Sequence, residues 1–312
     1  MGLALRARSG DPGTVCCLSM LRYAEPLYRP PSEADSLILQ VTLGCSYNRC
    51  TFCGMYRHKR FRVRPLDELV SEMDAVQAAL GAAVTKAFLA DGDALVAKPT
   101  LLSAVLAALR ERFPGLRRVS CYASPQALEL RSVEELTRLR EQGLTQYYLG
   151  VESGHDAVLA RLEKGVDAER MVACAAKASA AGVKLSTMIL LGAGGRALSR
   201  EHARASAEVI NRIQPRFVST LVMTPVEGTP LWEQAQAGEV EALAPLELAA
   251  ELLEFLEHLR LEGSIFRSNH ASNYLALGGT LPKDQPALVA GLRAVLARPE
   301  AARFRPPWMR GL

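Results

Sequence analysis

Apolar and polar residues follow one another along the chain in an order that predicts a strand and then a helix. Residues 37–43 are almost continuously apolar or β-branched, which is typical of a strand buried on both faces of a parallel sheet. From Leu66 to Leu80, apolar residues recur at three- and four-residue steps, which indicates an amphipathic helix. Asp67 and Glu68 stand in its first turn, where they suit the positive end of the helix dipole.

The same strand-then-helix pattern recurs five more times. The further predicted strands cover residues 87–90, 118–122, 147–151, 183–191 and 216–223. The helices that follow them cover residues 99–113, 133–142, 155–163 with 167–181, 200–213 and 246–261. Strands that alternate with helices pair in parallel through right-handed crossovers. The pattern therefore predicts an α/β fold, a TIM-like partial (β/α)6 barrel over residues 36–262, with a flat doubly wound sheet as the alternative.

Polar clusters come directly after several of the predicted strands. They occupy residues 45–53, 91–93, 152–153 and 192–195. In barrels of this kind the working residues lie at the carboxyl ends of the strands. We therefore expect these four clusters to share one functional edge.

The regular pattern is absent from both ends of the chain. Residues 1–35 lack the continuous apolar centre of a secretory signal, and we expect a flexible N-terminal extension there. Residues 263–312 are predicted to form a C-terminal extension with a polar loop and a helix at 284–297. Polar side chains are concentrated in residues 267–274, which is typical of a binding loop. We expect this loop to bind substrate or close the barrel, with His270 as the candidate for catalytic proton transfer.

Composition restricts the class of protein. With 49% hydrophobic residues in 312, the chain has ample material for a buried core. Its net charge of +4 is too small to indicate nucleic-acid binding. No apolar run approaches the ~20 residues that span a bilayer, so we expect a soluble protein that does not bind membranes. Seven cysteines, three of them clustered, do not form a disulfide framework and favour the reducing cytoplasm.

Three cysteines are the strongest chemical signal. Cys45, Cys50 and Cys53 form a C-x4-C-x2-C run just after the first predicted strand. Thiolates so close together favour iron–sulfur or zinc chemistry, and three ligands leave one metal position open. A zinc knuckle with His58 as the fourth ligand is the alternative, although structural zinc sites usually use two separated pairs of ligands.

The cysteine loop, together with the predicted barrel, resembles the radical SAM superfamily. In that family three closely spaced cysteines follow the first barrel strand, and an aromatic residue precedes the third, as Phe52 does here. The usual spacing is C-x3-C-x2-C, so this chain has one extra residue and its subfamily stays open. The resemblance implies a [4Fe–4S] cluster on Cys45, Cys50 and Cys53. It also implies S-adenosylmethionine (SAM), cleaved reductively to a 5′-deoxyadenosyl radical that abstracts hydrogen from a substrate.

Other residues match the family's SAM-binding motifs in part. Asp91-Gly92-Asp93 stands where the family often has Gly-Gly-Glu for the methionine amine, with a capped turn as the alternative. Glu152 and Ser153 resemble the ribose-binding motif. Leu190 and Gly192 fit the middle of an adenine-lining motif, although Leu190 is equally compatible with the core.

The remaining candidates concern partners and radical chemistry. Cys121, at the end of the third predicted strand, is a candidate radical-quenching thiol or else a small buried residue. The other histidines within helical patterns, His202 among them, are expected on the surface. The basic run at residues 57–64 is a solvated loop, a docking site for an acidic electron donor such as a flavodoxin or ferredoxin, or a site that holds an anionic substrate.

The leading interpretation is an oxygen-sensitive radical SAM enzyme that acts on a small molecule. About 35 residues precede the barrel, which is too few for a cobalamin domain, and no second cysteine cluster follows. The alternatives are a radical SAM enzyme that modifies RNA or a peptide, an iron–sulfur electron carrier, and a zinc-binding structural protein. The substrate, the fate of SAM, the reductant and the oligomeric state lie beyond the sequence.

Overall fold

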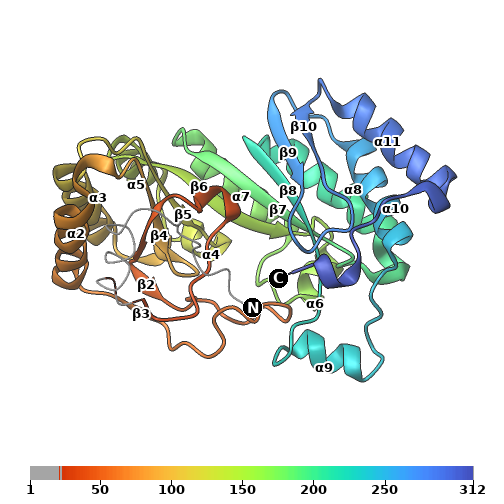
Figure 1. Ribbon diagram of the computed structural model, residues 1–312, viewed down its shortest axis with the longest axis horizontal. Coiled ribbons are helices and arrows are strands. Elements are labelled where there is room, and N and C mark those ends of the chain that lie inside the picture. Colours follow the sequence, from red (N-terminus) through yellow and green to blue (C-terminus); the bar gives the residue numbers. More distant parts are fainter. Residues whose placement is uncertain (1–20, 22, 312) are drawn as a thin grey trace, which may run out of the picture. The chain divides into compact units, whose positions relative to one another are not determined.

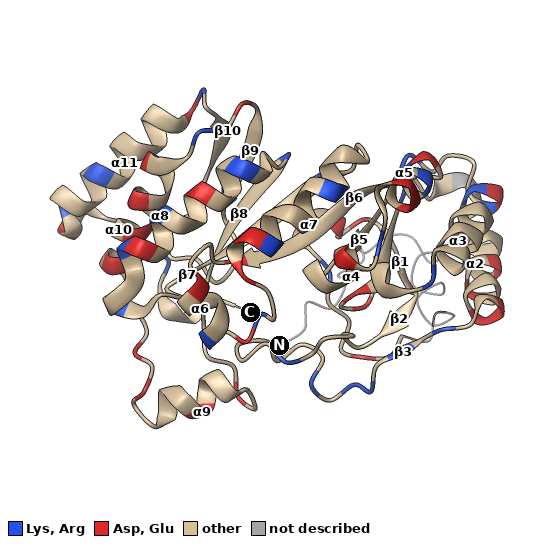
Figure 2. Cartoon of the chain, turned by 180° about the vertical axis from the view of Figure 1, so that it is seen from behind, with Lys and Arg blue, Asp and Glu red and all other residues tan. Residues whose placement is uncertain are grey.

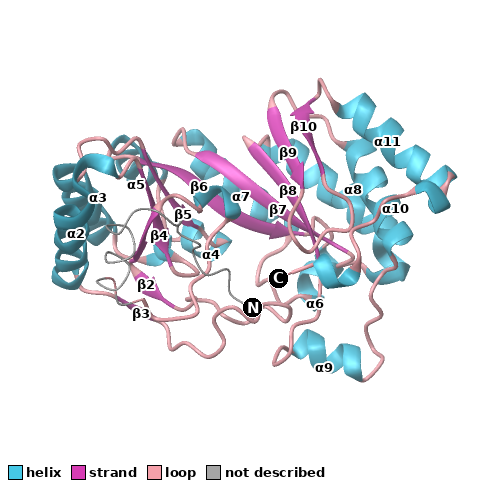
Figure 3. Ribbon diagram, in the orientation of Figure 1, coloured by secondary structure: helices cyan, strands magenta, loops and turns pink. Residues whose placement is uncertain are grey.

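Strands and helices alternate along the computed structural model, which describes residue 21 and residues 23–311 (Figure 3). By its internal contacts the chain divides into two compact units. The second unit contains Arg49–Gly54, Tyr148–Ser179 and the chain from Lys184 onward, and the first contains the remainder. Parallel strands with connecting helices form most of each unit, so the predicted α/β fold is confirmed. Most of the predicted flexible extension, with Cys16 and Cys17, lies outside the described residues.

The first unit is built on strands that pair in parallel in the order β1-β4-β5, with β6 next in the sheet. Its strands are β1 (Leu37–Gln40), β2 (Thr42–Leu43), β3 (Arg62–Val63), β4 (Lys86–Ala90), β5 (Arg118–Tyr122) and the start of β6 (Leu144–Glu152). Its helices are α2 (Leu66–Leu80), α3 (Pro99–Arg112), α4 (Pro125–Glu129) and α5 (Val133–Glu141), with short 3-10 turns η1 (Pro31–Glu33), η2 (Gly81–Ala83) and η3 (Ala94–Val96). β2 and β3 form a separate antiparallel pair.

The first unit follows its sequence pattern closely. Helix α2 buries Leu69, Met73 and Val76 on one face, as the three- and four-residue steps predicted, and it packs on α3. Helix α5 begins with a capping box in which Ser132 and Glu135 satisfy each other's backbone donors. These local signals fix where the helices begin, and the buried strands between them form the core.

The second unit continues from the end of β6 in the order β6-β7-β8-β9-β10. Its strands are β7 (Lys184–Leu191), β8 (Phe217–Val222), β9 (Ser264–Ser268) and β10 (Leu277–Leu281). Its helices are α6 (Asp156–Arg161), α7 (Ala168–Ala180), α8 (Gly195–Ile213), α9 (Pro230–Gln236), α10 (Pro245–His258) and α11 (Gln285–Ala297), with 3-10 turns η4 (Pro299–Ala301) and η5 (Pro307–Met309). Helix α11 packs against β10 and α10 (Figure 1).

The C-terminal segment holds two strands that the sequence pattern did not predict. The expected loop and helix are present, but Ser264–Ser268 forms β9, which pairs in parallel with β8. β10 then returns antiparallel to β9. The sheet therefore extends beyond the predicted sixth strand, and a parallel partner for β8 explains the apolar Ile265 and Phe266.

Asn273 explains much of the polar density in this region. Its side-chain oxygen accepts from the backbone N–H of Val222 at 2.9 Å. Its amide group donates to the carbonyl of Thr220 at 2.7 Å and to the Ser268 hydroxyl at 2.9 Å. Asn273 thus completes the hydrogen bonding at the end of β8, where buried backbone groups need partners.

Two arginines attach the C-terminal residues to the same loop. Arg305 donates to the carbonyls of His270, Ala271 and Asn273. The guanidinium of Arg310 stacks on the Tyr274 ring at 3.9 Å and donates to the Tyr274 hydroxyl and the Ser272 carbonyl. Polar residues in this loop therefore serve the fold, whatever further role they have.

Asn273→Ala should lower the free energy of unfolding by about 2–3 kcal/mol, because it removes the buried hydrogen bonds to Val222, Thr220 and Ser268. Urea denaturation of the variant and wild type measures this loss. Asn269→Ala, at an exposed asparagine of the same loop, is the matched control and should change stability by less than about 0.5 kcal/mol. Equal losses in the two variants would show that Asn273 does not support β8.

Candidate functional site

The cysteine loop begins in the first unit, beside the turn after β4. Cys45 is half-buried and follows Gly44, whose carbonyl accepts from the backbone N–H of Gly92 at 3.1 Å. A Cβ atom at position 92 would lie 2.6 Å from the Tyr56 ring and 2.9 Å from the Cβ of Cys45. Only glycine fits at such a close approach, so Gly92 is required for the path of the cysteine loop.

Asp91 and Asp93 hold this loop in place with buried carboxylates. Asp91 accepts from the backbone N–H of Gly44 at 3.1 Å and from the Lys59 ammonium at 2.9 Å. Asp93 accepts from the Ser46 hydroxyl at 2.6 Å and from the Ser124 hydroxyl at 2.7 Å. Both carboxylates therefore bind groups of the protein, as in the capped-turn alternative, and a SAM contact for either stays a prediction.

The basic run contributes two of its cations to the interior. Lys59 pairs with Asp91 and also donates to the carbonyls of Ala24 and Pro26. Arg64 is buried and pairs with Glu68 and Glu72 of α2. Neither side chain fits a fully solvated loop. Arg60 and Arg62 are exposed.

The rest of the cysteine loop belongs to the second unit. The backbone N–H of Cys53 donates to the carbonyl of Cys50 at 3.2 Å, which closes a tight turn around Phe52. Thr51 donates through its backbone to the carbonyl of Leu162 and accepts from Leu231. The Phe52 ring packs against a buried apolar cluster of Val158, Leu162, Leu190 and Ala193. These contacts fix the turn that carries Cys50 and Cys53, which are both half-buried.

A buried ion pair lies near these two cysteines. The Lys164 ammonium donates to the Glu152 carboxylate at 2.9 Å, and both side chains are about nine-tenths buried. Burial disfavours the ammonium, but the charges of Glu152, Cys50 and Cys53 outweigh it and raise the pKa of Lys164 above its usual range. Lys164 therefore stays cationic beside Cys50 and Cys53. None of the sequence motifs described above includes Lys164.

The backbone around Glu152 is shaped for this pair. Glu152 has φ +65°, a left-handed conformation that side chains other than glycine rarely adopt. A Cβ atom on Gly150 would lie 2.0 Å from the Glu152 carboxylate and 3.0 Å from the Lys164 nitrogen. Gly154 is equally constrained, because a Cβ there would lie 2.1 Å from the Ala205 carbonyl. Positive φ at a buried polar residue is a recognised mark of functional sites.

A buried network joins the ends of β6 and β7. The Nδ1 atom of His202 is 2.8 Å from the Ser153 hydroxyl, and its Nε2 is 3.1 Å from the Leu190 carbonyl. Glu251 of α10 accepts from the backbone N–H of Gly192 at 2.6 Å and from the Ser199 hydroxyl at 2.5 Å. Its carboxylate lies 3.7 Å from the Nε2 of His202. The two side chains thus position the turns that carry Ser153 and Gly192.

Burial determines the charge of both network residues. Desolvation lowers the pKa of His202 to about 4, so its imidazole is neutral at pH 7. Because the Leu190 carbonyl can only accept, the proton of the neutral ring is on Nε2 and Ser153 donates to Nδ1. Burial raises the pKa of Glu251 to about 7. The prediction that His202 lies on the surface is wrong, since it occupies a buried position of α8.

The predicted adenine-lining residues differ in their surroundings. Leu190 is buried in the apolar cluster that contacts Phe52. Gly192 has φ +85°, and its N–H is held by Glu251. Ser153 is fully buried, and its hydroxyl accepts from the backbone of His155 as well as binding His202. Contacts of these residues with a ligand stay predictions.

The two catalytic candidates lie in different units of the chain. Cys121 is fully buried on β5, and burial raises the pKa of its thiol well above the usual range. His270 is half-buried, with Nδ1 accepting from the backbone of Ser272 at 3.1 Å. Burial, and then the charge of Arg305, lowers its pKa. Neither observation tests a catalytic role. Within residue 21 and residues 23–311, no group of three or more His, Cys, Asp or Glu side chains is placed to hold a metal ion.

Comparison with known proteins identifies the class of enzyme. The structure combines an α/β fold with parallel strands, a three-cysteine loop after the first strand and a buried ion pair near Cys50 and Cys53. The family model of the Radical SAM superfamily matches residues 39–201, just over half of the chain. The chain belongs to this superfamily of enzymes. Its members normally use a [4Fe–4S] cluster and SAM.

A curated relative is the uncharacterized protein MJ0486 of Methanocaldococcus jannaschii, which is 26% identical over 136 residues. The match covers 43% of this chain and 42% of that protein, so the chain spans less than half the length of this relative.

Solved structures show the same fold at low sequence identity. Methylornithine synthase (PylB) is 16% identical, with a TM-score of 0.53 over 87% of this chain and 74% of that chain. Coproporphyrinogen III oxidase (HemN) from Escherichia coli, a radical SAM enzyme, is 18% identical. Its TM-score is 0.55, and the match covers 80% of this chain and 56% of that chain. The cobalamin-dependent S-adenosylmethionine radical enzyme OxsB is 14% identical. Its TM-score is 0.56, and the match covers 71% of this chain and 41% of that chain. At these identities the likeness concerns the fold alone.

Glu251→Gln should change how stability depends on pH. Because the pKa of Glu251 rises from 4.5 to about 7 on folding, its contribution is present below pH 4.5 and is lost as pH rises to 7. Wild type should therefore lose roughly 3 kcal/mol relative to the glutamine variant between pH 5 and pH 8.

Urea denaturation of both proteins across this pH range measures the difference. His202 titrates in the opposite direction in both proteins, and the glutamine variant is the reference from which the contribution of Glu251 is read. A constant difference in unfolding free energy across the range would show that Glu251 is ionised throughout.

Proposed function

We propose that the chain holds a [4Fe–4S] cluster on Cys45, Cys50 and Cys53, binds SAM, and acts on a small-molecule substrate. When bound, the cluster would supply the electron that cleaves SAM reductively to methionine and a 5′-deoxyadenosyl radical. The observation that carries the proposal is the cationic Lys164 beside Cys50 and Cys53, with its carboxylate partner Glu152. Three thiols within nine residues are a donor set suited to iron–sulfur chemistry.

The chain's own residues have separate roles in this proposal. Gly92 allows the cysteine loop its close path, and Asp91 and Asp93 anchor that loop through Gly44 and Ser46. Lys164 offsets the negative charge of thiolates, which lowers the electrostatic cost of assembling an anionic centre. The turn around Phe52 shields its neighbourhood from water by packing on apolar side chains.

The proposed SAM contacts are groups at the ends of β4, β6 and β7. They comprise Asp91, Gly92, Asp93, Glu152, Ser153, Leu190 and Gly192. Glu152 is the best supported of these, because a buried carboxylate in a left-handed conformation is suited to accept from a ribose hydroxyl. Ser153 already donates to His202, so it has only acceptor capacity for a ligand.

The proposal extends to partners and compartment. An acidic electron donor such as a flavodoxin or ferredoxin would meet the exposed Arg60 and Arg62, since Lys59 and Arg64 are engaged inside the protein. A cluster with an open iron position is sensitive to oxygen, which favours the reducing cytoplasm. None of the described helices is long and apolar enough to cross a membrane.

Each of Cys45→Ala, Cys50→Ala and Cys53→Ala should reduce reconstituted iron at least tenfold and abolish SAM cleavage. The measurements are iron content, electron paramagnetic resonance of the reduced protein with and without SAM, and chromatography of 5′-deoxyadenosine, all under anaerobic conditions. Cys174→Ala, at a buried cysteine of α7, is the matched control and should retain the cluster signal. A full cluster signal and SAM cleavage in any of the three variants would disprove the assignment of that cysteine.

Lys164→Met should weaken SAM binding at least tenfold and lower the free energy of unfolding by about 3 kcal/mol, because it strands the buried carboxylate of Glu152. The double variant Lys164→Met with Glu152→Gln removes both charges and should recover most of that stability. If these residues serve SAM binding, the double variant stays defective in equilibrium dialysis with SAM despite its recovered stability. Recovered SAM affinity would mean that the pair has only a structural role.

A further inference from the structure

Arg267 is unusual among the charged residues of the sheet, because it stands inside a strand and not at its end. In β1 and β4–β10, the charged residues other than Arg267 stand at a strand end, namely Lys86, Arg118, Glu152 and Lys184. Figure 2 shows the same preference, with most blue and red segments on helices and loops. Arg267 is exposed within β9, and in the part of the chain that the structure describes it pairs with no carboxylate. Its guanidinium donates to the carbonyl of Phe266 at 2.8 Å, which leaves most of its donors available.

Strand register places Arg267 in a row across four strands of the second unit. Met188 of β7 pairs with Ser219 of β8, Ser219 with Arg267, and Arg267 with Gly278 of β10. Because side chains alternate between the faces of a sheet, these residues share one face. All four are half-exposed or exposed. Their strand neighbours Thr187, Val218 and Phe266 are fully buried on the opposite face. The face that carries Arg267 is therefore open.

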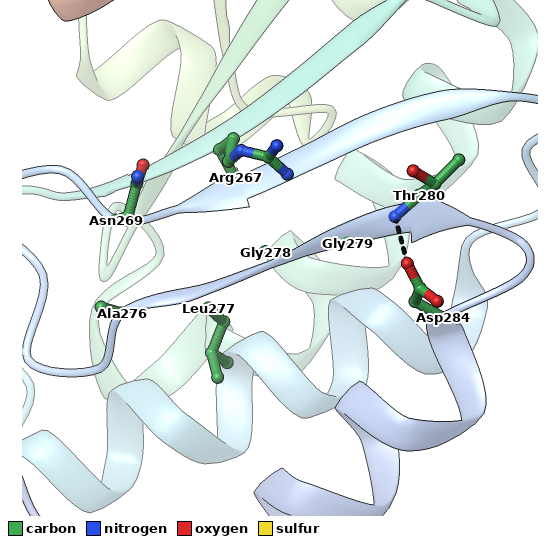
Figure 4. A pocket seen from close by; sticks show the side chains of 8 residues that line it. All are labelled: Arg267, Asn269, Ala276, Leu277, Gly278, Gly279, Thr280 and Asp284. Carbon is green, nitrogen blue, oxygen red and sulfur yellow. Dashed lines mark hydrogen bonds between the residues drawn. The ribbon is translucent and has the colours of Figure 1, made fainter.

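The hairpin is shaped around the arginine side chain. A Cβ atom on Gly278 would lie 3.1 Å from the Nη1 of Arg267 and 3.2 Å from its Cδ, so glycine leaves the space in which the side chain lies. A shallow, open cavity of about 520 Å³ lies here, lined by Arg267, Asn269, Ala276, Leu277, Gly278, Gly279, Thr280 and Asp284. Figure 4 shows Arg267 and Asn269 on one side of the hairpin and Leu277 on the other.

Asp284 has a structural task at the rim of this cavity. Its carboxylate accepts from the backbone N–H of Thr280 at 2.8 Å, which joins the end of β10 to the start of α11. That hydrogen bond holds the carboxylate at the turn. Arg267 is accordingly the one cation among the lining residues, and its planar guanidinium matches the paired oxygens of a carboxylate or phosphate.

We propose that this cavity binds the anionic end of the substrate, a carboxylate or phosphate group, with Arg267 as the anchoring cation. The inference rests on the proposed radical SAM function, because Leu190, a proposed SAM contact, lies two residues beyond Met188 on the same face. Neighbouring strands are about 4.8 Å apart, so the row of Arg267 lies two strand spacings, about 10 Å, across the sheet from β7. A small molecule anchored at Arg267 spans that distance.

The test is direct binding of small anions to the full chain, without added SAM. The probes are glutarate for carboxylates, glycerol 3-phosphate for phosphates, and the uncharged glutaramide and glycerol. Saturation-transfer nuclear magnetic resonance and calorimetry measure the dissociation constants. We expect at least one anion to bind wild type, Arg267→Met to weaken that binding at least tenfold, and neither uncharged probe to bind. Which anion binds distinguishes a carboxylate substrate from a phosphate substrate.

Arg298→Met is the matched control, because it removes the same charge from an exposed arginine just after α11. It should change anion binding by less than twofold. Arg267→Lys keeps the charge but loses the paired geometry, and it should lie between wild type and the methionine variant. If Arg267→Met fails to fold, the anion affinity of Arg267→Lys still tests whether the paired geometry of Arg267 is needed for binding.

Three results would overturn the proposal. The first is that neither anion binds the wild-type protein. The second is that Arg267→Met and Arg298→Met weaken anion binding equally, and the third is that Arg267→Lys binds the anions as weakly as Arg267→Met does. Failure of the proposed function is separate, since it would appear as absent SAM cleavage in wild type while Arg267-dependent anion binding persists.

Discussion

The ion pair between Lys164 and Glu152 is the interaction on which the candidate site depends. Removing two charges from water is costly, and the cost is met only when each charge faces an opposite one at close range. Gly150 provides the space, and the left-handed backbone at Glu152 turns the carboxylate toward the ammonium. The electrostatic effect of Cys50 and Cys53 in turn raises the pKa of Lys164. One buried pair thus links the end of β6 to the cysteine loop.

The same principle recurs wherever a loop must be held at the end of a strand. Asp91 and Asp93 fix the start of the cysteine loop, and His202 with Glu251 fixes the turns after β6 and β7. Asn273 does the same for the end of β8. In each case a buried polar side chain binds backbone or side-chain groups at or near the end of a strand. Rigid loops of this kind are what a site needs if its first ligands are to be held in fixed geometry.

Several features were predictable from the sequence because they depend on local patterns. Continuous apolar runs identified the parallel strands, and three- and four-residue steps identified α2 and its buried face. The cysteine spacing identified the loop, and its chemistry follows from the ligands alone. β9 escaped prediction because Arg267 and Ser268 interrupt a short apolar run, and only pairing with β8 makes that run a strand. His202 was misjudged because a histidine within a helical pattern is usually exposed, whereas here it lies on the buried face of α8. Its partners Ser153 and Leu190 satisfy the buried ring.

The sequence by itself determined the alternation of strands and helices, the three thiols and the membership of the radical SAM superfamily that they indicate. These depend on residue type and spacing, which are properties of short segments. Only the tertiary structure decided which polar groups are buried and what they bind. It turned Lys59 and Arg64 inward, paired Lys164 with Glu152, and left Arg267 exposed on an open sheet face. The reason is physical: the cost of burying a charge depends on partners that are distant in the chain, and only the folded chain brings those partners together.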